Sequence, residues 1–184
     1  MLTAWADESG SQPDRDPGTY LIAAALCEAD DVPALRAAMS ELRLPGEKKV
    51  HWHGSSDARR QDLIDAVAAL PVAGFVVVRS ESGAADRRHR RKCLEYLLPN
   101  LADMPCSRIT FESRGQLDRS DTDLLQKFRA QRVVSAGLRI DHAIGRAEPA
   151  LAVADIVCGA VVQSRVGNAD YLAALGNAVE LHHV

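Results

Sequence analysis

The sequence has few aromatic residues, no excess of positive charge and no long apolar run. Phe, Trp and Tyr make up only 4% of its 184 residues, which argues against a stacking surface for single-stranded nucleic acid. The formal net charge of -3 argues against tight binding of nucleic acid through overall charge, although a locally basic groove remains compatible with it. No apolar stretch reaches the roughly 18 to 20 residues that cross a bilayer, so we expect no membrane association.

The four cysteines form no Cys-x-x-Cys pair, and Cys27 and Cys158 lie within apolar stretches. Free thiols in such places behave as small hydrophobic side chains, which favours a reduced protein of the cytoplasm. The residues ahead of Asp7 contain neither a basic leader nor a secretory apolar core, and this also favours the cytoplasm. A homo-oligomer is compatible with the sequence.

Apolar runs alternate with polar breaks in a pattern that predicts one α/β domain over residues 1–184. The pattern predicts strands at 2–6, 19–27, 74–79, 107–112 and 138–142, and a short extended piece at 50–53. It predicts helices at 31–44, 55–70, 86–101 and 117–134, and one or two more after residue 149. An opening hairpin followed by this alternation indicates a mixed sheet of about five strands flanked by helices. His182 and His183 are expected at the surface or in a disordered tail.

Three carboxylates, those of Asp7, Glu112 and Asp155, stand at unusual places. Asp155 lies in a stretch that is apolar on nearly every face of a helix, which is typical of a buried helix. Because an unpaired buried carboxylate costs several kcal/mol, it needs a cation or strong donors. Asp7 and Glu112 end predicted strands, and parallel strands bring such residues to one crevice. Three hard oxygen ligands suit one or two Mg2+ or Mn2+ ions.

Each of these acids also has a plainer interpretation. Asp7 suits a turn at the end of a strand, and Glu112 suits an exposed acid paired with Arg114. Asp155 suits the buried partner of an arginine. The arginines considered for that role are Arg79 and Arg139.

Two further groups of residues are candidates for function. His51 and His53 would share one side of an extended piece, but no further ligands follow at zinc-finger spacing; a structural or surface role is the default, and His51 is the candidate for phosphodiester chemistry. A dense basic run occupies residues 87–92. A solvated helix face is its default interpretation, and a phosphate-binding patch is the functional one. The patch would consist of Arg87, Arg88, Arg91 and Lys92.

Three short motifs together resemble a known family. They are Ala6-Asp7-Glu8-Ser9-Gly10, Val50-His51, and the closing stretch from Leu151 through Asp155 to Gly159-Ala160. They resemble a widespread prokaryotic domain of unknown function, family 3800, whose fold is RNase H-like and related to retroviral integrases and Holliday-junction resolvases. The resemblance implies that Asp7, Glu112 and Asp155 bind the metal and act in catalysis, with His51 assisting.

The chain departs from the pattern of this family at two places. Glu112 stands where Asp is more usual, and Ile140-Asp141-His142 stands where Asp-Ser-Lys is usual. The second departure leaves Asp141 or His142 open as a further ligand, and Glu8 is another candidate.

The leading hypothesis is therefore a nuclease that hydrolyses phosphodiester bonds of DNA or RNA with Mg2+ or Mn2+. A catalytically inactive interaction module of the same fold, with Asp155 as a structural buried acid, is the alternative from another class. A phosphatase or nucleotide hydrolase that uses the same ions is the third.

Overall fold

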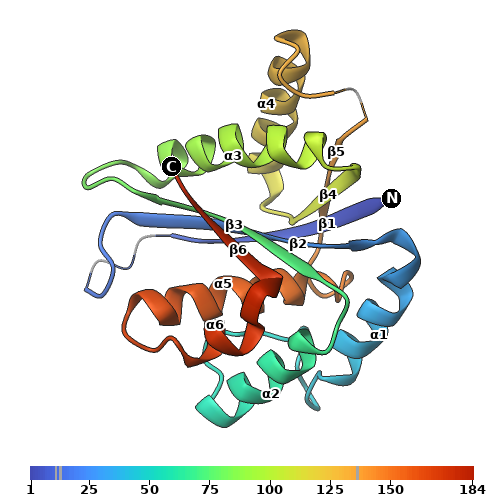
Figure 1. Ribbon diagram of the computed structural model, residues 1–184, viewed down its shortest axis with the longest axis vertical. Helices are drawn as coiled ribbons and strands as arrows, with labels where there is room; N and C mark the ends of the chain where they lie inside the picture. Colours follow the sequence, from blue (N-terminus) through green and yellow to red (C-terminus); the bar gives the residue numbers. More distant parts are fainter. Residues whose placement is uncertain (11, 13, 136) are drawn as a thin grey trace.

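The computed structural model describes residues 1–10, 12, 14–135 and 137–184, and its centre is a mixed β-sheet (Figure 1). In the described chain the sheet has six strands in the order β5-β4-β1-β2-β3-β6. Only β2 is antiparallel to its neighbours; the other adjacent pairs are parallel. The strands are β1 (Leu2–Ser9), β2 (Thr19–Glu28), β3 (Ala73–Ser80), β4 (Cys106–Glu112), β5 (Arg139–Ala143) and β6 (Val179–His183).

Helices cover both faces of this sheet (Figure 1). One face carries α1 (Val32–Glu41), α2 (Asp57–Ala68), α5 (Leu151–Arg165) and α6 (Asp170–Leu175). The other face carries α3 (Asp86–Asp103) and α4 (Asp118–Ala130). Short 3-10 turns lie at Ala29–Asp31, Gly115–Leu117 and Gly176–Ala178. None of the described helices is both long and apolar enough to cross a membrane. The predicted α/β class is confirmed.

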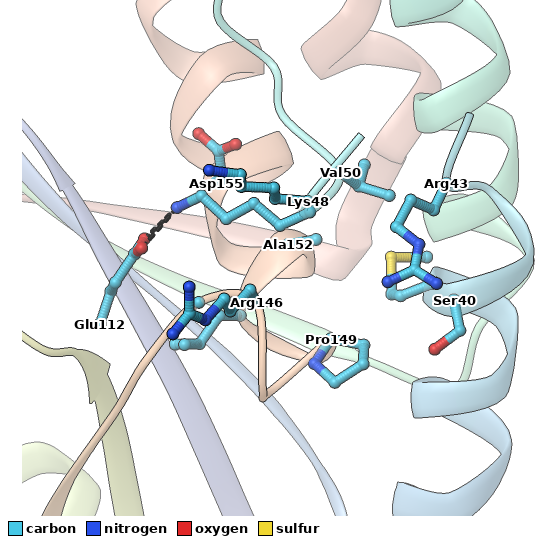
Figure 2. A pocket seen from close by; sticks show the side chains of 13 residues that line it. Ser40, Arg43, Lys48, Val50, Glu112, Arg146, Pro149, Ala152 and Asp155 are labelled. Atoms are coloured by element: carbon cyan, nitrogen blue, oxygen red, sulfur yellow. Dashed lines mark hydrogen bonds and ion pairs between the residues drawn. The ribbon is translucent and has the colours of Figure 1, made fainter. Parts of the chain in front are cut away.

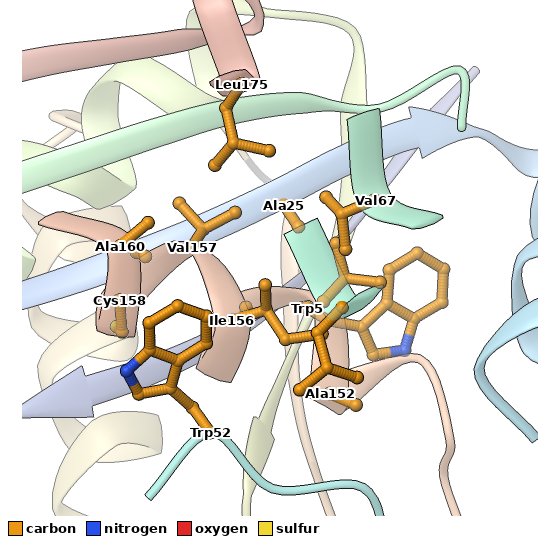
Figure 3. Close-up of a cluster of buried hydrophobic side chains, with 14 of the residues drawn as sticks. Trp5, Ala25, Trp52, Val67, Ala152, Ile156, Val157, Cys158, Ala160 and Leu175 are labelled. Carbon is orange, nitrogen blue, oxygen red and sulfur yellow. The ribbon is translucent and has the colours of Figure 1, made fainter. Parts of the chain in front are cut away.

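Strand β2 lies at the centre and is buried on both sides along nearly its whole length. Ala23 and Ala25 face α5, whereas Ile22 and Ala24 face α3, because successive side chains of a strand point to opposite faces. The α5 face is packed with large apolar side chains around Trp5, Val67 and Ile156 (Figure 3). Helix α5 is buried from Leu151 to Val161 except at Asp155, which confirms the prediction of a buried closing helix.

The end of the chain differs from its prediction. Strand β6 pairs with β3, and the ring of His182 stacks on Phe75 with 4.0 Å between centroids. The hydroxyl of Tyr96 lies 3.2 Å from Nδ1 of His182. The expectation of a surface or disordered tail was therefore wrong for His182, while His183 is exposed but belongs to the strand. The five-residue strand is too short for its alternation to be recognised, and its partner is remote in sequence.

The piece at residues 50–53 is not a strand either. It is irregular chain between α1 and α2 and pairs with no described strand. Its conformation comes from side-chain burial instead, since Val50 and Trp52 are each only 5% exposed. The argument that His51 and His53 share one side of a strand therefore does not hold.

Candidate active site

Strands β1 and β4 bring Asp7 and Glu112 to one place on the sheet. The two strands are parallel, and Ala6 lies opposite Phe111, so the residues that follow, Asp7 and Glu112, are neighbours. Ala6 and Phe111 pack on the α3 side. By alternation, the two carboxylates point to the α5 side. The predicted convergence at the carboxyl ends of parallel strands is confirmed for this pair, although β1 continues beyond Asp7 to Ser9.

Helix α5 carries Asp155 to the same side of the sheet. Its Oδ2 accepts a hydrogen bond of 2.9 Å from the backbone N–H of Trp52. One turn further along α5, a Cβ on Gly159 would lie 2.2 Å from the indole ring of Trp52. The spacing Asp-x-x-x-Gly therefore has a physical reason, because the carboxylate holds the backbone of Trp52 while the glycine makes room for its ring. Figure 3 shows this ring against the side of α5.

The charges of the three acids act on one another. Burial, followed by repulsion from Asp155, raises the pKa of Asp7 from 3.8 to about 7, and Glu112 adds to the rise. Burial also raises the pKa of Asp155, although the N–H of Trp52 and the positive charge of Lys49 oppose it. The three carboxylates thus form one acidic cluster with too little positive charge around it.

Lys49 supplies the nearest cation of this cluster, and sequence reasoning missed it. Its Nζ donates to both oxygens of Glu112, each at 2.5 Å. A Cβ on Gly145 would lie 2.4 Å from Oε1 of Glu112 and 2.8 Å from Cδ of Lys49. Gly145 therefore lets this ion pair pack directly on the backbone. The available signal was the Lys48-Lys49 pair directly before Val50-His51.

The arginine partners that the sequence suggested for Glu112 and Asp155 are not found among the described residues. Arg114 does not pair with Glu112 but lies 3.2 Å from Glu8. Arg79 pairs with Glu81, and neither Arg79 nor Arg139 is a described partner of Asp155. By alternation with Val78, Arg79 points away from α5, whereas Arg139 is exposed on the edge strand β5.

His51 lies at the edge of the acidic cluster. Its Nδ1 is 3.8 Å from Oδ2 of Asp155, and its side chain is 52% exposed. His53, by contrast, is exposed in the turn before α2. In the described part of the chain, no group of three or more His, Cys, Asp or Glu side chains is arranged to hold a metal ion as it stands.

The three further ligand candidates lie away from this cluster. Glu8 points to the opposite face, where Arg90 of α3 donates to it at 2.5 Å. Arg90 also binds Asp121, and Nε2 of His142 lies 3.0 Å from the same carboxylate. Asp141 is half-exposed on the edge strand β5. Glu8 and His142 therefore belong to a second, buried charge network, and Asp141 belongs to neither.

A pocket that is open to solvent lies beside Glu112 and Asp155. Three exposed cationic residues line it, Arg43, Lys48 and Arg146 (Figure 2). None of their side chains has an ion-pair partner among the described residues. We call these three residues the basic rim. Sequence reasoning did not single them out, because they come from two segments about a hundred residues apart and form no dense run.

The predicted basic patch at Arg87, Arg88, Arg91 and Lys92 lies elsewhere. It is exposed on α3, which covers the face opposite α5. Arg88 pairs with Glu81, and Arg91 and Lys92 both pair with Glu95. The structure therefore does not bring this patch to the acidic pocket, and three of its four cations share the two carboxylates of Glu81 and Glu95.

Comparisons with known proteins agree with this architecture. The chain matches RNase HII of Archaeoglobus fulgidus, from its complex with PCNA, over 90% of this chain and 75% of that chain, with a TM-score of 0.61 and 15% identity. It matches ribonuclease H2 of Pyrococcus horikoshii OT3 over 90% and 74%, with a TM-score of 0.61 and 16% identity. The fold is RNase H-like. Bst-RNase HIII in complex with Mn2+ matches with a TM-score of 0.58 and 15% identity, and this chain spans 53% of its length.

These identities establish the fold alone. No family model matches the chain, and no curated protein matches it. The resemblance to family 3800 thus gains no support from the family comparison, whereas the RNase H-like architecture that it implied is confirmed.

Proposed function

We propose that this protein is a divalent-metal-dependent nuclease that hydrolyses phosphodiester bonds at the cluster of Asp7, Glu112 and Asp155. The observation that carries the proposal is the convergence of these carboxylates from β1, β4 and α5 on one face of an RNase H-like sheet. The Mn2+ complex of Bst-RNase HIII supports a metal on this fold at the level of architecture.

The donor chemistry fits a hard divalent cation. When all three are ionised, the carboxylates with one nearby ammonium leave about two negative charges uncompensated, and Mg2+ and Mn2+ prefer such oxygen ligands. Asp7, Glu112 and Asp155 would hold the ion. When bound, it would polarise a phosphoryl oxygen and lower the pKa of a water molecule.

The protein's own residues supply the remaining parts of the reaction. The Trp52 N–H orients Asp155. His51 directs Nδ1 towards Asp155 while half of its side chain meets solvent. A ring in this position can take a proton from the nucleophilic water or give one to the leaving oxygen.

We assign the nucleic-acid contact to the basic rim rather than to α3. Arg43, Lys48 and Arg146 line the pocket that contains Glu112 and Asp155, and unpaired cations attract phosphates more effectively than paired ones. The acidic net charge is no obstacle, because the local field of a groove governs the approach of a charged substrate.

Thermal melting with and without millimolar Mn2+ tests the metal site first. At a Mn2+ concentration a hundred times the dissociation constant, binding adds about 2.7 kcal/mol of stability. We expect this rise in wild type and in Asp141→Asn, which removes a carboxylate outside the cluster, and not in Asp155→Asn. If neither Mn2+ nor Mg2+ raises the melting point of wild type, the proposal is wrong.

Labelled single- and double-stranded DNA and RNA then test the activity. We expect cleavage of at least one substrate that requires the metal and disappears in Asp155→Asn. Binding of that substrate to Arg43→Ala and Arg146→Ala should weaken, with a salt dependence reduced by about one phosphate contact each. Arg87→Ala should bind like wild type. If only Arg87→Ala weakens binding, the substrate lies over α3 and the assignment to the basic rim is wrong.

A further inference from the structure

The ammonium of Lys49 binds Glu112, one of the three carboxylates that would hold the proposed metal ion. It binds both oxygens of Glu112, and its charge lowers the pKa of both Asp7 and Asp155. One side chain thus neutralises part of the charge of all three carboxylates. Because Glu112 cannot give the same two oxygens to Lys49 and to a metal ion, the two cations compete for it.

We infer that Lys49 is a built-in counter-cation that a divalent ion must displace from Glu112, so that Lys49 sets the metal concentration at which the site fills. This inference rests on the proposed function, since it concerns the loading of the same site. It also accounts for the finding that no described group of carboxylates is arranged to hold a metal as it stands.

The exposure of the ion pair makes the exchange feasible. The side chains of Lys49 and Glu112 are 25% and 34% exposed, and ion pairs that meet solvent contribute little to stability. The Arg90–Asp121 pair on the other face is 7% and 1% exposed, and opening it would break a buried charge network. Of these two pairs, only that of Lys49 can open without disturbing the core.

The residues that follow Lys49 are anchored, so the exchange of its ammonium for a metal ion moves only its side chain. Val50 and Trp52 are buried, and Trp52 is held by Asp155 and by its fit against Gly159. The backbone of Lys49 therefore stays in place while its long, flexible side chain swings. Its released ammonium then remains in the pocket that the basic rim lines, where it adds a fourth cation for an incoming phosphate.

Mn2+ titration of metal-free protein by calorimetry tests this inference, with three substitutions. Lys49→Met removes the competing charge and retains most of the side-chain volume. Lys49→Arg retains the charge. Lys48→Met is the matched control, because Lys48 lines the same pocket but binds none of the carboxylates. Folding of each variant is checked by its melting curve in chelator.

We expect Lys49→Met to bind Mn2+ roughly tenfold more tightly than wild type, because a unit charge within a few Å changes an ionic equilibrium by about that factor. Lys49→Arg and Lys48→Met should stay within about twofold of wild type. In chelator, Lys49→Met should melt below wild type, since its carboxylates repel one another without compensation.

Each other outcome has a separate meaning. If wild type and Lys49→Met bind Mn2+ equally, or if Lys49→Met binds more weakly, the inference is wrong and the proposed function stands. If Lys49→Met binds Mn2+ but wild type does not, the competition is supported in an extreme form. The proposed function then fails for this chain, whose ammonium permanently replaces the metal. If neither binds, both fail.

Discussion

Asp7→Asn is the most informative single change, because burial and the other carboxylates make the charge of Asp7 costly. Its pKa is about 7 in the folded protein against an ordinary 3.8, so the folded state holds this proton more tightly than the unfolded state does. Stability must therefore fall as the pH rises between these two values. This sign is opposite to that of an acid stabilised by an ion pair, such as Asp16 beside Arg165, whose pKa is lowered.

The size of the effect follows from the two pKa values. Proton linkage predicts that ionisation of Asp7 lowers the free energy of unfolding by roughly 2 to 3 kcal/mol between pH 5 and pH 8. For a chain of this length that corresponds to roughly 5 to 10 °C in melting temperature. The amide of Asn keeps the shape and carries no charge, so Asp7→Asn should not show this loss.

Melting curves in chelator at pH 5, 6, 7 and 8 measure the effect. The variant should melt increasingly above wild type as the pH rises, because the other titrating groups are common to both proteins. Asp141→Asn, which changes an exposed carboxylate on β5, should follow wild type. A difference between Asp7→Asn and wild type that stays constant from pH 5 to pH 8 would show that Asp7 is not held in a repulsive, buried cluster.

Three further changes test other parts of the structure. Gly159→Ala should lower the free energy of unfolding by about 1 to 3 kcal/mol through overpacking against Trp52, and it should weaken the response of the melting point to Mn2+. A variant as stable as wild type would contradict the close approach of Trp52 to Gly159. Asp121→Asn should lower the free energy of unfolding in urea by roughly 3 kcal/mol, because it removes one charge of the buried pair with Arg90. An unchanged free energy of unfolding would mean that water reaches the pair. His182→Ala should lower the free energy of unfolding by about 1 kcal/mol, because the stack of its ring on Phe75 is lost. An unchanged melting temperature would contradict this packing and favour a disordered tail.

The sequence alone predicts the α/β class, most of the element positions and the convergence of the acids. Asp155 was recognisable because a charge inside an apolar helix needs a partner, and Asp7 and Glu112 because each lies at or near the end of an apolar strand. Lys49 was not, since its partner Glu112 lies 63 residues away and a lysine in a polar loop needs no explanation.

Other features escaped because they depend on remote pairing. Strand β6 has no distinctive pattern of its own and forms by adding to the edge of β3. Asp121 lies in the first turn of α4, where an acid suits the helix dipole, yet only 1% of its side chain is exposed and it binds Arg90. Local sequence can suggest a helix cap, but it cannot show that a second helix delivers a guanidinium to the same carboxylate.

The packing of Trp52 against Gly159 also affects how the sequence of such a protein can vary in evolution. It fixes the chain immediately after Lys49 to helix α5, whereas Arg43 and Lys48 lie on exposed, irregular chain before that point. Residues 43–48 can therefore be exchanged or lengthened without moving the carboxylates beneath them, since loops on a rigid framework tolerate such variation. Under the proposed function, substrate preference would then diversify while the reacting groups stay the same.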